Sequence, residues 1–314
     1  EDAAGNTVMR RVYDRNGGGN IVGQETEDGN HAYQYDAIDQ LTGAVYSAMP
    51  DFAASALTNE SYDYDRMGNR LSSSGGTSSV ASAYWANELN QYTQVVNTAT
   101  NVLSYDLNGN MIRRVVNGVT NYIEWDMTDR LAAIRDGDSN LLARYYYDPF
   151  GRRLSKTVFS GGTSNTTYFL YADEGLVAEF DAAGDEIRTY GYMPNSLWMN
   201  DPLYLQTTRN DATTNQELFF FLNDHLGAPQ KLVDKNGAVV WSMVAESFGR
   251  AMVSPGAVIE NDLRQSSQYY DAESGLHYNG MRYYDPELGA YLSRDPLGEA
   301  RGLNLATFGR SDPR

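Results

Sequence analysis

Short stretches in which apolar and polar residues alternate recur along the whole chain. In one of them the apolar side chains fall on Ile123, Trp125 and Met127, which is the two-residue period of a half-buried β-strand. Further along, strand-like stretches at 231–233 and 238–243 flank a polar segment that contains the turn dipeptide Asn-Gly, which indicates a hairpin. The pattern therefore predicts an all-β fold made of short strands and tight turns.

Composition supports this interpretation. The 314 residues include 24 Tyr and 29 Gly but only 9 Pro, and Tyr favours strands whereas Gly serves turns with positive φ. Helical patterns are weak, and few, short helices are expected, at Phe52–Leu57 and Leu297–Leu305. No run of 18 apolar residues occurs, so the sequence predicts no membrane span.

An aromatic residue followed by Asp, with a Gly three or four residues after the Asp, recurs through the chain. Asp106, Asp126 and Asp148 follow one another at intervals of 20 and 22 residues, which leaves room for two strands and their turns. Clear copies are Tyr64-Asp65 with Gly68, Tyr105-Asp106 with Gly109, Tyr147-Asp148 with Gly151, Phe180-Asp181 with Gly184, Tyr270-Asp271 with Gly275, and Tyr284-Asp285 with Gly289, and Asp14 with Gly18 is a weaker early copy.

Each residue type in this repeat has a physical role. The Asp side chain accepts hydrogen bonds from backbone N–H groups two residues on and closes a turn, and Gly occupies its left-handed position. We expect the Tyr ring to lie across the neighbouring strand with its hydroxyl bonded to a backbone group, and nearby Arg side chains to stack on Tyr rings. One such unit cannot bury its apolar face alone, so the copies are expected to stack side by side as a ribbon.

The last third of the chain carries more specific motifs. Asp224, His225 and Gly227 belong to the segment Asn-Asp-His-Leu-Gly-Ala-Pro, and a longer segment rich in Tyr, Asp and Gly runs from Tyr270 to Leu305. Together with the repeats, these segments resemble the YD repeat and the core-associated motif of the RHS family, which includes bacterial Rhs proteins, the C components of Tc toxins and animal teneurins. The positions that match the longer motif include Tyr284, Asp285, Gly298, Gly302 and Asn304.

The resemblance implies a β-hairpin ribbon that spirals into part of a hollow shell. In bacterial members the shell encloses a C-terminal toxin, and the core-associated segment closes one end. The resemblance divides this chain into a YD-repeat region, 1–222, and an RHS core-associated region, 223–314. The implied function is an encapsulation scaffold, secreted or delivered to the cell surface, whose partners are the enclosed toxin domain, the remainder of the shell or further copies of the chain, and secretion-system components.

The resemblance also implies an aspartyl autoprotease, of which Arg294 and Asp295 supply half. Two carboxylates that share a site cannot both ionise cheaply, so one acts as an acid while the other activates water. The family's second Asp-Pro-x-Gly segment would fall beyond residue 314, and Asp285 and Asp312 are the substitutes considered in this chain. We therefore expect the segment around Asp295 to form a turn, and the chain as it stands not to act as an enzyme.

Other chemistry has less support. His225 beside Asp224 suggests a catalytic base, but no nucleophilic Ser motif accompanies the pair, so a structural histidine in a turn is expected. Oxygen ligands alternate at 106–110 and 136–140 as they do in calcium loops, but both segments also fit hairpin turns, which we favour. Aromatic rings beside acidic residues suggest an alternative function, a module that binds carbohydrate or a cell surface, although such rings also pack between strands.

Charge and cysteine content exclude further classes. With 24 basic against 41 acidic residues the net charge is −17, which argues against nucleic acid or anionic lipid as a partner. The chain has no Cys and 3 His, so neither a metal site nor a cofactor is predicted. An open ribbon has two unpaired sheet edges, and from these we expect association with other protein segments.

Overall fold

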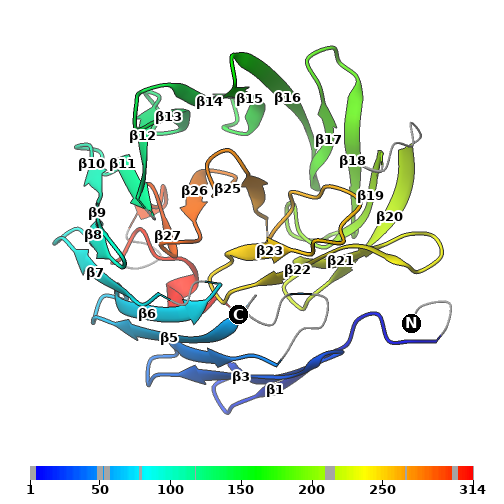
Figure 1. Cartoon of the computed structure of the whole chain (residues 1–314), viewed down its shortest axis with the longest axis horizontal. Helices are drawn as coiled ribbons and strands as arrows, with labels where there is room; N and C mark the ends of the chain where they lie inside the picture. The colour runs from blue at the N-terminus through cyan, green and yellow to red at the C-terminus, as the bar shows by residue number, and fades with distance from the viewer. Residues whose placement is uncertain are drawn as a thin grey trace.

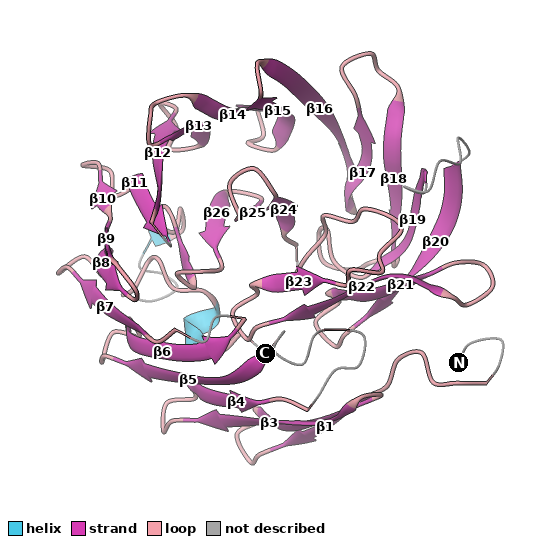
Figure 2. Cartoon of the chain, viewed as in Figure 1, coloured by secondary structure: helices cyan, strands magenta, loops and turns pink. Residues whose placement is uncertain are grey.

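The computed structural model describes residues 5–47, 52, 57–77, 80–116, 118–208, 216–265, 267–298 and 303–313. Strands dominate these residues and no α-helix occurs among them, which confirms the predicted all-β class (Figure 2). The expected helix at 297–305 is wrong for residues 303–305, because 303 and 305 are bends and 304 has no regular secondary structure. Residues 299–302, and most of the other expected helix at 52–57, lie outside the described residues. A short 3-10 helix, η2 (Gly309–Ser311), follows near the C-terminus.

The strands follow one another in order within three sheets, and neighbours pair antiparallel, as in a ribbon of hairpins. The first sheet contains β1 (Arg11–Arg15), β2 (Ile21–Thr26), β3 (Gly29–Tyr35), β4 (Leu41–Val45), β5 (Thr58–Tyr64), β6 (Arg70–Gly76), β7 (Ser82–Ala86), β8 (Tyr92–Val96) and β9 (Thr100–Val102). The second contains β10 (Ser104–Tyr105), β11 (Met111–Val116), β12 (Val119–Trp125), β13 (Leu131–Asp136), β14 (Leu141–Tyr147), β15 (Arg153–Ser160), β16 (Thr163–Ala172), β17 (Gly175–Phe180), β18 (Glu186–Tyr192), β19 (Pro202–Thr208), β20 (Gln216–Asn223), β21 (Pro229–Val233), β22 (Val239–Ala245) and β23 (Ala251–Val253). The third contains β24 (Tyr269–Asp271), β25 (Leu276–Asn279), β26 (Arg282–Asp285) and β27 (Ala290–Tyr291).

The two larger sheets form one curved wall, β1–β23, because β9 and β11 lie side by side where one sheet ends and the other begins. In Figure 1 the wall runs from β1 through β6, β12 and β16 round to β22. The described residues that follow it, 254–265, 267–298 and 303–313, lie within the arc, and we call them the inner segment. The wall continues without interruption past residues 222 and 223, where the sequence motifs change. A curved YD-repeat shell is therefore present, and its interior is occupied by the chain's own C-terminal part.

The turn after β14 explains why the Tyr-Asp-x-x-Gly pattern forms hairpins. One carboxylate oxygen of Asp148 accepts the backbone N–H groups of Phe150, at 2.8 Å, and Arg152, at 2.9 Å. Gly151 has a φ of 84°, a left-handed conformation that costs glycine little. The strand register shifts at Tyr147, so the turn is a three-residue hairpin loop that ends in a β-bulge.

In several hairpins of the wall, the aromatic residue just before the turn ties its strand to the preceding one. The hydroxyl of Tyr147 donates a hydrogen bond to the backbone oxygen of Leu131, at 2.7 Å. Because Leu131 directly follows the previous turn on the same side of the ribbon, the bond links two consecutive repeats. The same bond joins Tyr35 to Ile21, Tyr64 to Leu41, Tyr105 to Tyr92, Trp125 to Met111, and Tyr192 to Leu176.

Side chains of successive turns also bind one another along this rim of the wall. The amide nitrogen of Asn110 donates to the carboxylate of Asp129, at 2.7 Å. Arg130 of that second turn donates to the backbone oxygen of Asp148 in the next, at 3.3 Å. The rim is therefore a continuous chain of polar contacts that fixes the spacing between repeats.

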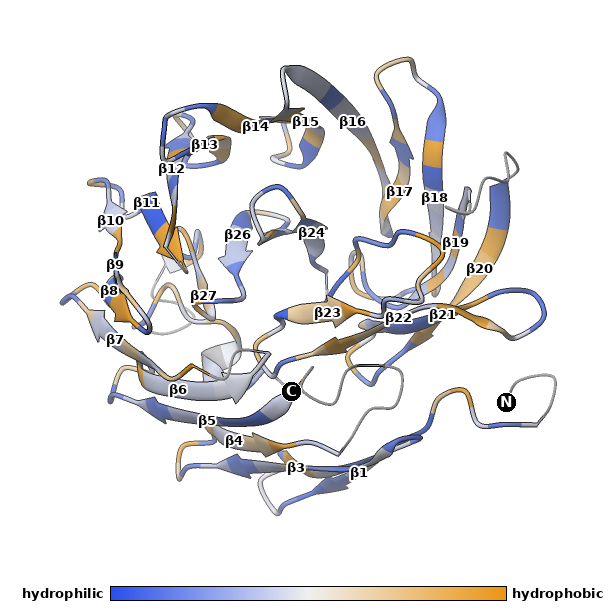
Figure 3. Cartoon of the chain, viewed as in Figure 1, coloured by the Kyte–Doolittle hydropathy of each residue, from blue (hydrophilic) through white to orange (hydrophobic). Residues whose placement is uncertain are grey.

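Alternation along each strand separates the two faces of the wall. In β14 the side chains of Ala143 and Tyr145 are buried and face inward, whereas Arg144 and Tyr146 are exposed on the outer face. Figure 3 shows hydrophobic and hydrophilic positions interleaved along the wall strands. Inward side chains of the wall and side chains of the inner segment form the larger core, which includes Leu131, Leu205, Phe219, Trp241, Leu276, Tyr283 and Leu292. A smaller core joins β2–β5 to the turn before β23 and includes Ile21, Tyr33, Leu41, Ala44, Tyr62 and Phe248.

The hydrogen bond from Tyr147 to Leu131 can be tested by removing the tyrosine hydroxyl. Tyr147→Phe keeps the ring but deletes the bond to Leu131, and we expect it to lower the free energy of unfolding by about 1 kcal/mol. The matched control is Tyr146→Phe on the outer face, where the ring is 52% exposed. Urea unfolding followed by circular dichroism measures both. Equal stability of the two variants would contradict the role given to the bond.

Candidate functional site

The interface between the wall and the inner segment is built from buried ion pairs. Arg114 on β11 points inward, and its Nε and Nη2 bind the two carboxylate oxygens of Asp285 at 2.6 and 3.0 Å. Asp285 is 0% exposed. Burial lowers the pKa of Arg114, but the Asp285 carboxylate outweighs burial and holds that pKa above its ordinary value. The pair is a two-bond clamp between residues that are 171 positions apart in the sequence.

A second anchor lies at β15. Asp271 of the inner segment binds Nη1 of Arg153 at 2.5 Å and the ammonium of Lys156 at 2.9 Å. Lys156 also binds Glu273, at 3.2 Å. Arg153 is fully buried, and aromatic rings surround its guanidinium, so cation–π contacts add to the ion pair. These rings belong to Tyr145, Phe169, Tyr269 and Tyr278.

Two further wall arginines complete the series. Arg188 on β18 binds Asp262, at 3.0 Å. Arg250, in the turn between β22 and β23, binds Glu287 at 2.9 Å. The inner segment is therefore held by arginines from four separate places along the arc, and sequence reasoning identified none of these arginines as an anchor.

The Tyr-Asp pairs of the inner segment differ from those of the wall. In the wall the Asp carboxylate closes its own turn. In the inner segment Asp271 binds wall cations, and Asp285 does both, because it accepts the backbone N–H of Glu287 at 3.0 Å and also binds Arg114. Tyr284 keeps the wall pattern, because its hydroxyl donates to the backbone oxygen of Phe248 at 2.7 Å. One sequence signal separates the two classes: in the inner segment the Gly follows the Asp by four positions instead of three.

The remaining wall residues singled out by the motifs sit in turns. Asp65 accepts the backbone N–H of Asn69 at 2.9 Å, and Gly68 has a φ of 79°. Asn304 of the inner segment donates to the Asn69 side chain at 2.7 Å, which fastens the end of the chain to this turn. Gly302 lies outside the described residues.

Asp224, His225 and Gly227 form another turn of the repeat type. Asp224 accepts the backbone N–H of Ala228 at 3.0 Å, and Gly227 has a φ of 73°. Burial raises the pKa of Asp224. The His225 ring packs on the ring of Tyr13 from β1, with 4.5 Å between their centres. The contact between His225 and Tyr13 thus lies where β1, the first strand of the wall, approaches β20 and β21 near its other end.

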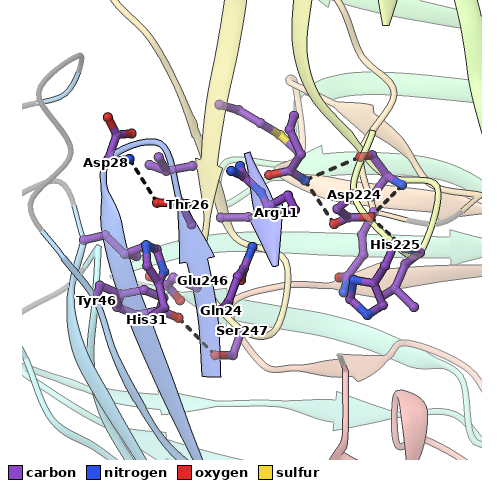
Figure 4. Close-up of a pocket in the computed structure, with 18 of the residues that line it drawn as sticks. Arg11, Gln24, Thr26, Asp28, His31, Tyr46, Asp224, His225, Glu246 and Ser247 are labelled. Atoms are coloured by element: carbon purple, nitrogen blue, oxygen red, sulfur yellow. Dashed lines mark hydrogen bonds between the residues drawn. The ribbon is translucent and has the colours of Figure 1, made fainter. Parts of the chain in front are cut away.

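Side chains, and not strand pairing, join the two ends of the described wall: β1–β3 at one end and β21–β23 at the other. We call this contact the seam. Glu27 binds Arg11 at 2.6 Å and Lys231 at 2.7 Å. Burial opposes ionisation of Glu27, but hydrogen bonds from Lys231 and from the backbone N–H of Arg10 outweigh it and lower its pKa to about 2. Figure 4 shows the cleft beside this seam, with Arg11 between the β1–β3 side and Asp224. The cleft contains about 1050 Å³ of space, part of which is open solvent.

Arg294 and Asp295 lie in a turn at the end of the inner segment. Asp295 accepts the backbone N–H of Leu297 at 2.9 Å and pairs with Arg282 at 3.2 Å. Gly298 has a φ of 61°, and Arg294 is exposed. Asp285, considered as a second carboxylate, is engaged by Arg114 in a separate ion pair. Among the described residues, the Asp295 carboxylate is therefore bound by the Arg282 side chain and by the backbone N–H of Leu297.

The two segments considered as calcium loops are hairpin turns. Asp106 accepts the backbone N–H of Asn110 at 2.8 Å, and Asp136 accepts that of Asn140 at 2.8 Å. No cluster of His, Asp or Glu suited to a metal ion occurs in the part of the chain that the structure describes. Among the same residues, no helix has the length and apolar character needed to cross a bilayer.

The curved repeat wall with an anchored inner segment defines a YD-shell protein. The chain matches the Teneurin YD-shell family over residues 9–302, and it belongs to that family. A solved Tc holotoxin pore from Photorhabdus luminescens has the same fold, with a TM-score of 0.66 and 16% identity over 97% of this chain and 18% of that one.

Curated relatives include bacterial toxins. The chain is 30% identical to toxin protein Tse5 of Pseudomonas aeruginosa over 339 residues, which cover 97% of the chain and 24% of Tse5. It is 27% identical to double-stranded DNA deaminase toxin A of Burkholderia cenocepacia over 330 residues, which cover 96% of the chain and 21% of that toxin. The chain thus spans about a quarter or less of the length of these relatives.

Removing one wall anchor tests the interface. Arg114→Met leaves the Asp285 carboxylate buried without its cation, and we expect it to lower the free energy of unfolding by about 3–5 kcal/mol. The control is the same substitution at Arg144, which is exposed on the outer face. Urea unfolding curves measure both variants. Similar small losses at the two positions would rule out an anchoring role for Arg114.

The seam should weaken in acid. The pKa of Glu27 in the folded chain, about 2, lies below its ordinary value of 4.5, so its ionised carboxylate stabilises the folded chain above pH 4.5. That contribution is lost as the pH falls from 4.5 toward 2. The stability difference between the wild type and Glu27→Gln should therefore shrink over this range, as measured by urea midpoints at several pH values. A constant difference would contradict the assignment, and Glu88→Gln in an exposed turn serves as the control.

Proposed function

We propose that this chain is the C-terminal part of an Rhs-type shell that encloses and presents a toxin domain. Membership in the YD-shell family supports the scaffold role. The relatives that carry the name toxin are four or more times as long as the matched region, so the shell segment occupies only a part of each of them. The toxic activity therefore belongs, in this proposal, to a region other than the shell segment.

The observation that carries the proposal is the anchoring of the inner segment inside the wall. Four ion pairs, each with at least one largely buried partner, hold the segment where it fills the arc. A segment fixed in this way closes one end of the shell and directs the polypeptide that follows it. An independent binding module would not need to fill its own concave face.

The proposal extends to partners and location. Strand β1 ends the order of the first sheet, and a terminal strand presents unpaired backbone groups to which further strands add. We infer that the remainder of the shell, or further copies of the chain, pair with such an edge. The assembled protein is secreted or delivered to a cell surface with the help of secretion-system components. The net charge of −17 fits neither nucleic acid nor anionic lipid as a partner of the shell.

Arg294 and Asp295 enter the proposal as one half of an aspartyl autoproteolytic site. The other carboxylate would come from the polypeptide that follows, and its approach would have to compete with Arg282 for Asp295. Two neighbouring carboxylates share one proton, because both cannot be charged at low cost. Once the pair holds that proton, Asp295 no longer needs Arg282 to balance its charge, and the second carboxylate can approach.

Protease protection in the full-length gene product tests enclosure. We expect peptides from the polypeptide after residue 314 to resist digestion in the native protein and to appear in mass spectra only when urea opens the shell. Arg114→Met should lower the urea concentration at which they appear, because it loosens the inner segment. The exposed-face variant Arg144→Met should leave that concentration unchanged.

Two results would overturn the proposal. One is a gene product whose reading frame ends at residue 314, because nothing would then be left to enclose. The other is a following polypeptide that is digested in the native protein as fast as in the unfolded one.

A further inference from the structure

A second cavity lies between the wall and the inner segment, separate from the cleft at the seam. It contains about 910 Å³ of space, a large part of which is continuous with solvent. Its lining includes Arg114, Asn121 and Leu142 from the wall and Arg264, Tyr270 and His277 from the inner segment.

The charged groups around this cavity are paired, with one exception. Arg114 binds Asp285, and the Arg250 guanidinium binds Glu287. Glu273, on the same lining, binds a lysine of β15. Arg264 makes no ion pair with any residue that the structure describes, although it is 6% exposed.

The Arg264 guanidinium is fixed on one side and open on the other. Its Nη1 donates to the backbone oxygens of Asn261, at 2.7 Å, and Leu263, at 3.0 Å. The guanidinium carbon lies 4.8 Å from the centre of the Tyr270 ring. Its Nε and Nη2 donate to no described residue. The neighbouring Asp262 is held by Arg188 and by a tyrosine hydroxyl.

An unpaired guanidinium in such a place is costly. Burying a charge that has no direct ion-pair partner is unfavourable, and burial lowers the pKa of Arg264 by more than the nearby Asp262 carboxylate raises it. Its two free donors, Nε and Nη2, form the edge of the guanidinium that binds a carboxylate through two parallel hydrogen bonds. The cavity thus presents a rigid donor pair that lacks an acceptor.

We propose that this cavity binds a carboxylate, whose two oxygens accept hydrogen bonds from Nε and Nη2 of Arg264. A neutral or cationic ligand would leave Nε and Nη2 of the guanidinium without an anionic acceptor. A phosphate dianion is disfavoured because Glu273 and Glu287 line the same cavity and repel a second negative charge. The carboxylate belongs either to a small organic acid or to an acidic side chain of a peptide, and it would bridge the wall and the inner segment.

Thermal unfolding of the whole chain in different anions tests the site. Ligands that bind only the folded state raise the unfolding midpoint in proportion to their occupancy. We expect sodium acetate to raise the midpoint above that in sodium chloride of equal ionic strength, and N-acetyl-aspartyl amide to do the same. A larger effect of the aspartyl amide would identify a peptide side chain as the natural ligand, and a larger effect of acetate a small acid.

Arg264→Lys keeps the positive charge but removes the two-donor edge, so it should abolish the difference between acetate and chloride. Arg144→Lys on the outer face should retain the difference. Leu142→Phe, which narrows the cavity from the wall side and leaves Arg264 in place, gives a second variant and should also abolish it. The proposal fails if acetate and chloride give the same midpoint in the wild type, or if Arg264→Lys keeps the acetate effect. It also fails if the stabilisation lost on Arg264→Lys is larger in sodium phosphate than in either carboxylate, since phosphate stabilises proteins generally and only the Arg264-dependent part reports the site.

Discussion

The hydrogen bond from an aromatic side chain to the backbone oxygen at the start of the previous strand is the contact on which this architecture depends. An isolated hairpin is marginal in water, and a repeat of two strands cannot bury its inward face alone. The bond from Tyr147 to Leu131 joins one repeat to the next beside the turns, where strand pairing ends. Because the aromatic ring also reaches the inward face, one residue sets both the spacing of the wall and part of its core.

Much of the wall was predictable because its contacts are local in sequence. Asp148 closes a turn within four residues, and Tyr147 reaches a strand 16 residues away. Other turns escaped the pattern because they lack its residues: Asn87 replaces Asp in the turn that ends at Gln91, and Asn90 takes the left-handed position of Gly. Asn tolerates that conformation and its side chain accepts the same backbone bonds, so the geometry persists without the motif.

The anchors of the inner segment were not predictable by the same reasoning. Arg114 and Asp285 are 171 positions apart, and they meet only because the wall curves and returns. Their pairing depends on the accumulated register of many strands, which no short motif encodes. The Tyr-Asp pairs at 270–271 and 284–285 look like turn signals alone, yet both carboxylates also bind cations of the wall. The Tyr-Asp dipeptide therefore determines the local turn, whereas the place of that turn within the curved wall determines which wall cation the Asp carboxylate binds.

Buried ion pairs contribute more to specificity than to stability, since removing two charges from water offsets much of their attraction. In this chain the inner segment could slide along a wall of similar repeats if apolar contacts alone held it. Arg153 prevents this, because its guanidinium is fully buried among aromatic side chains and binds a single carboxylate, that of Asp271. With Arg114 and Arg188 on other strands, a shifted segment would leave several buried charges unpaired at once. The repeated wall supplies a uniform surface, and the charges select the single position at which the segment fits.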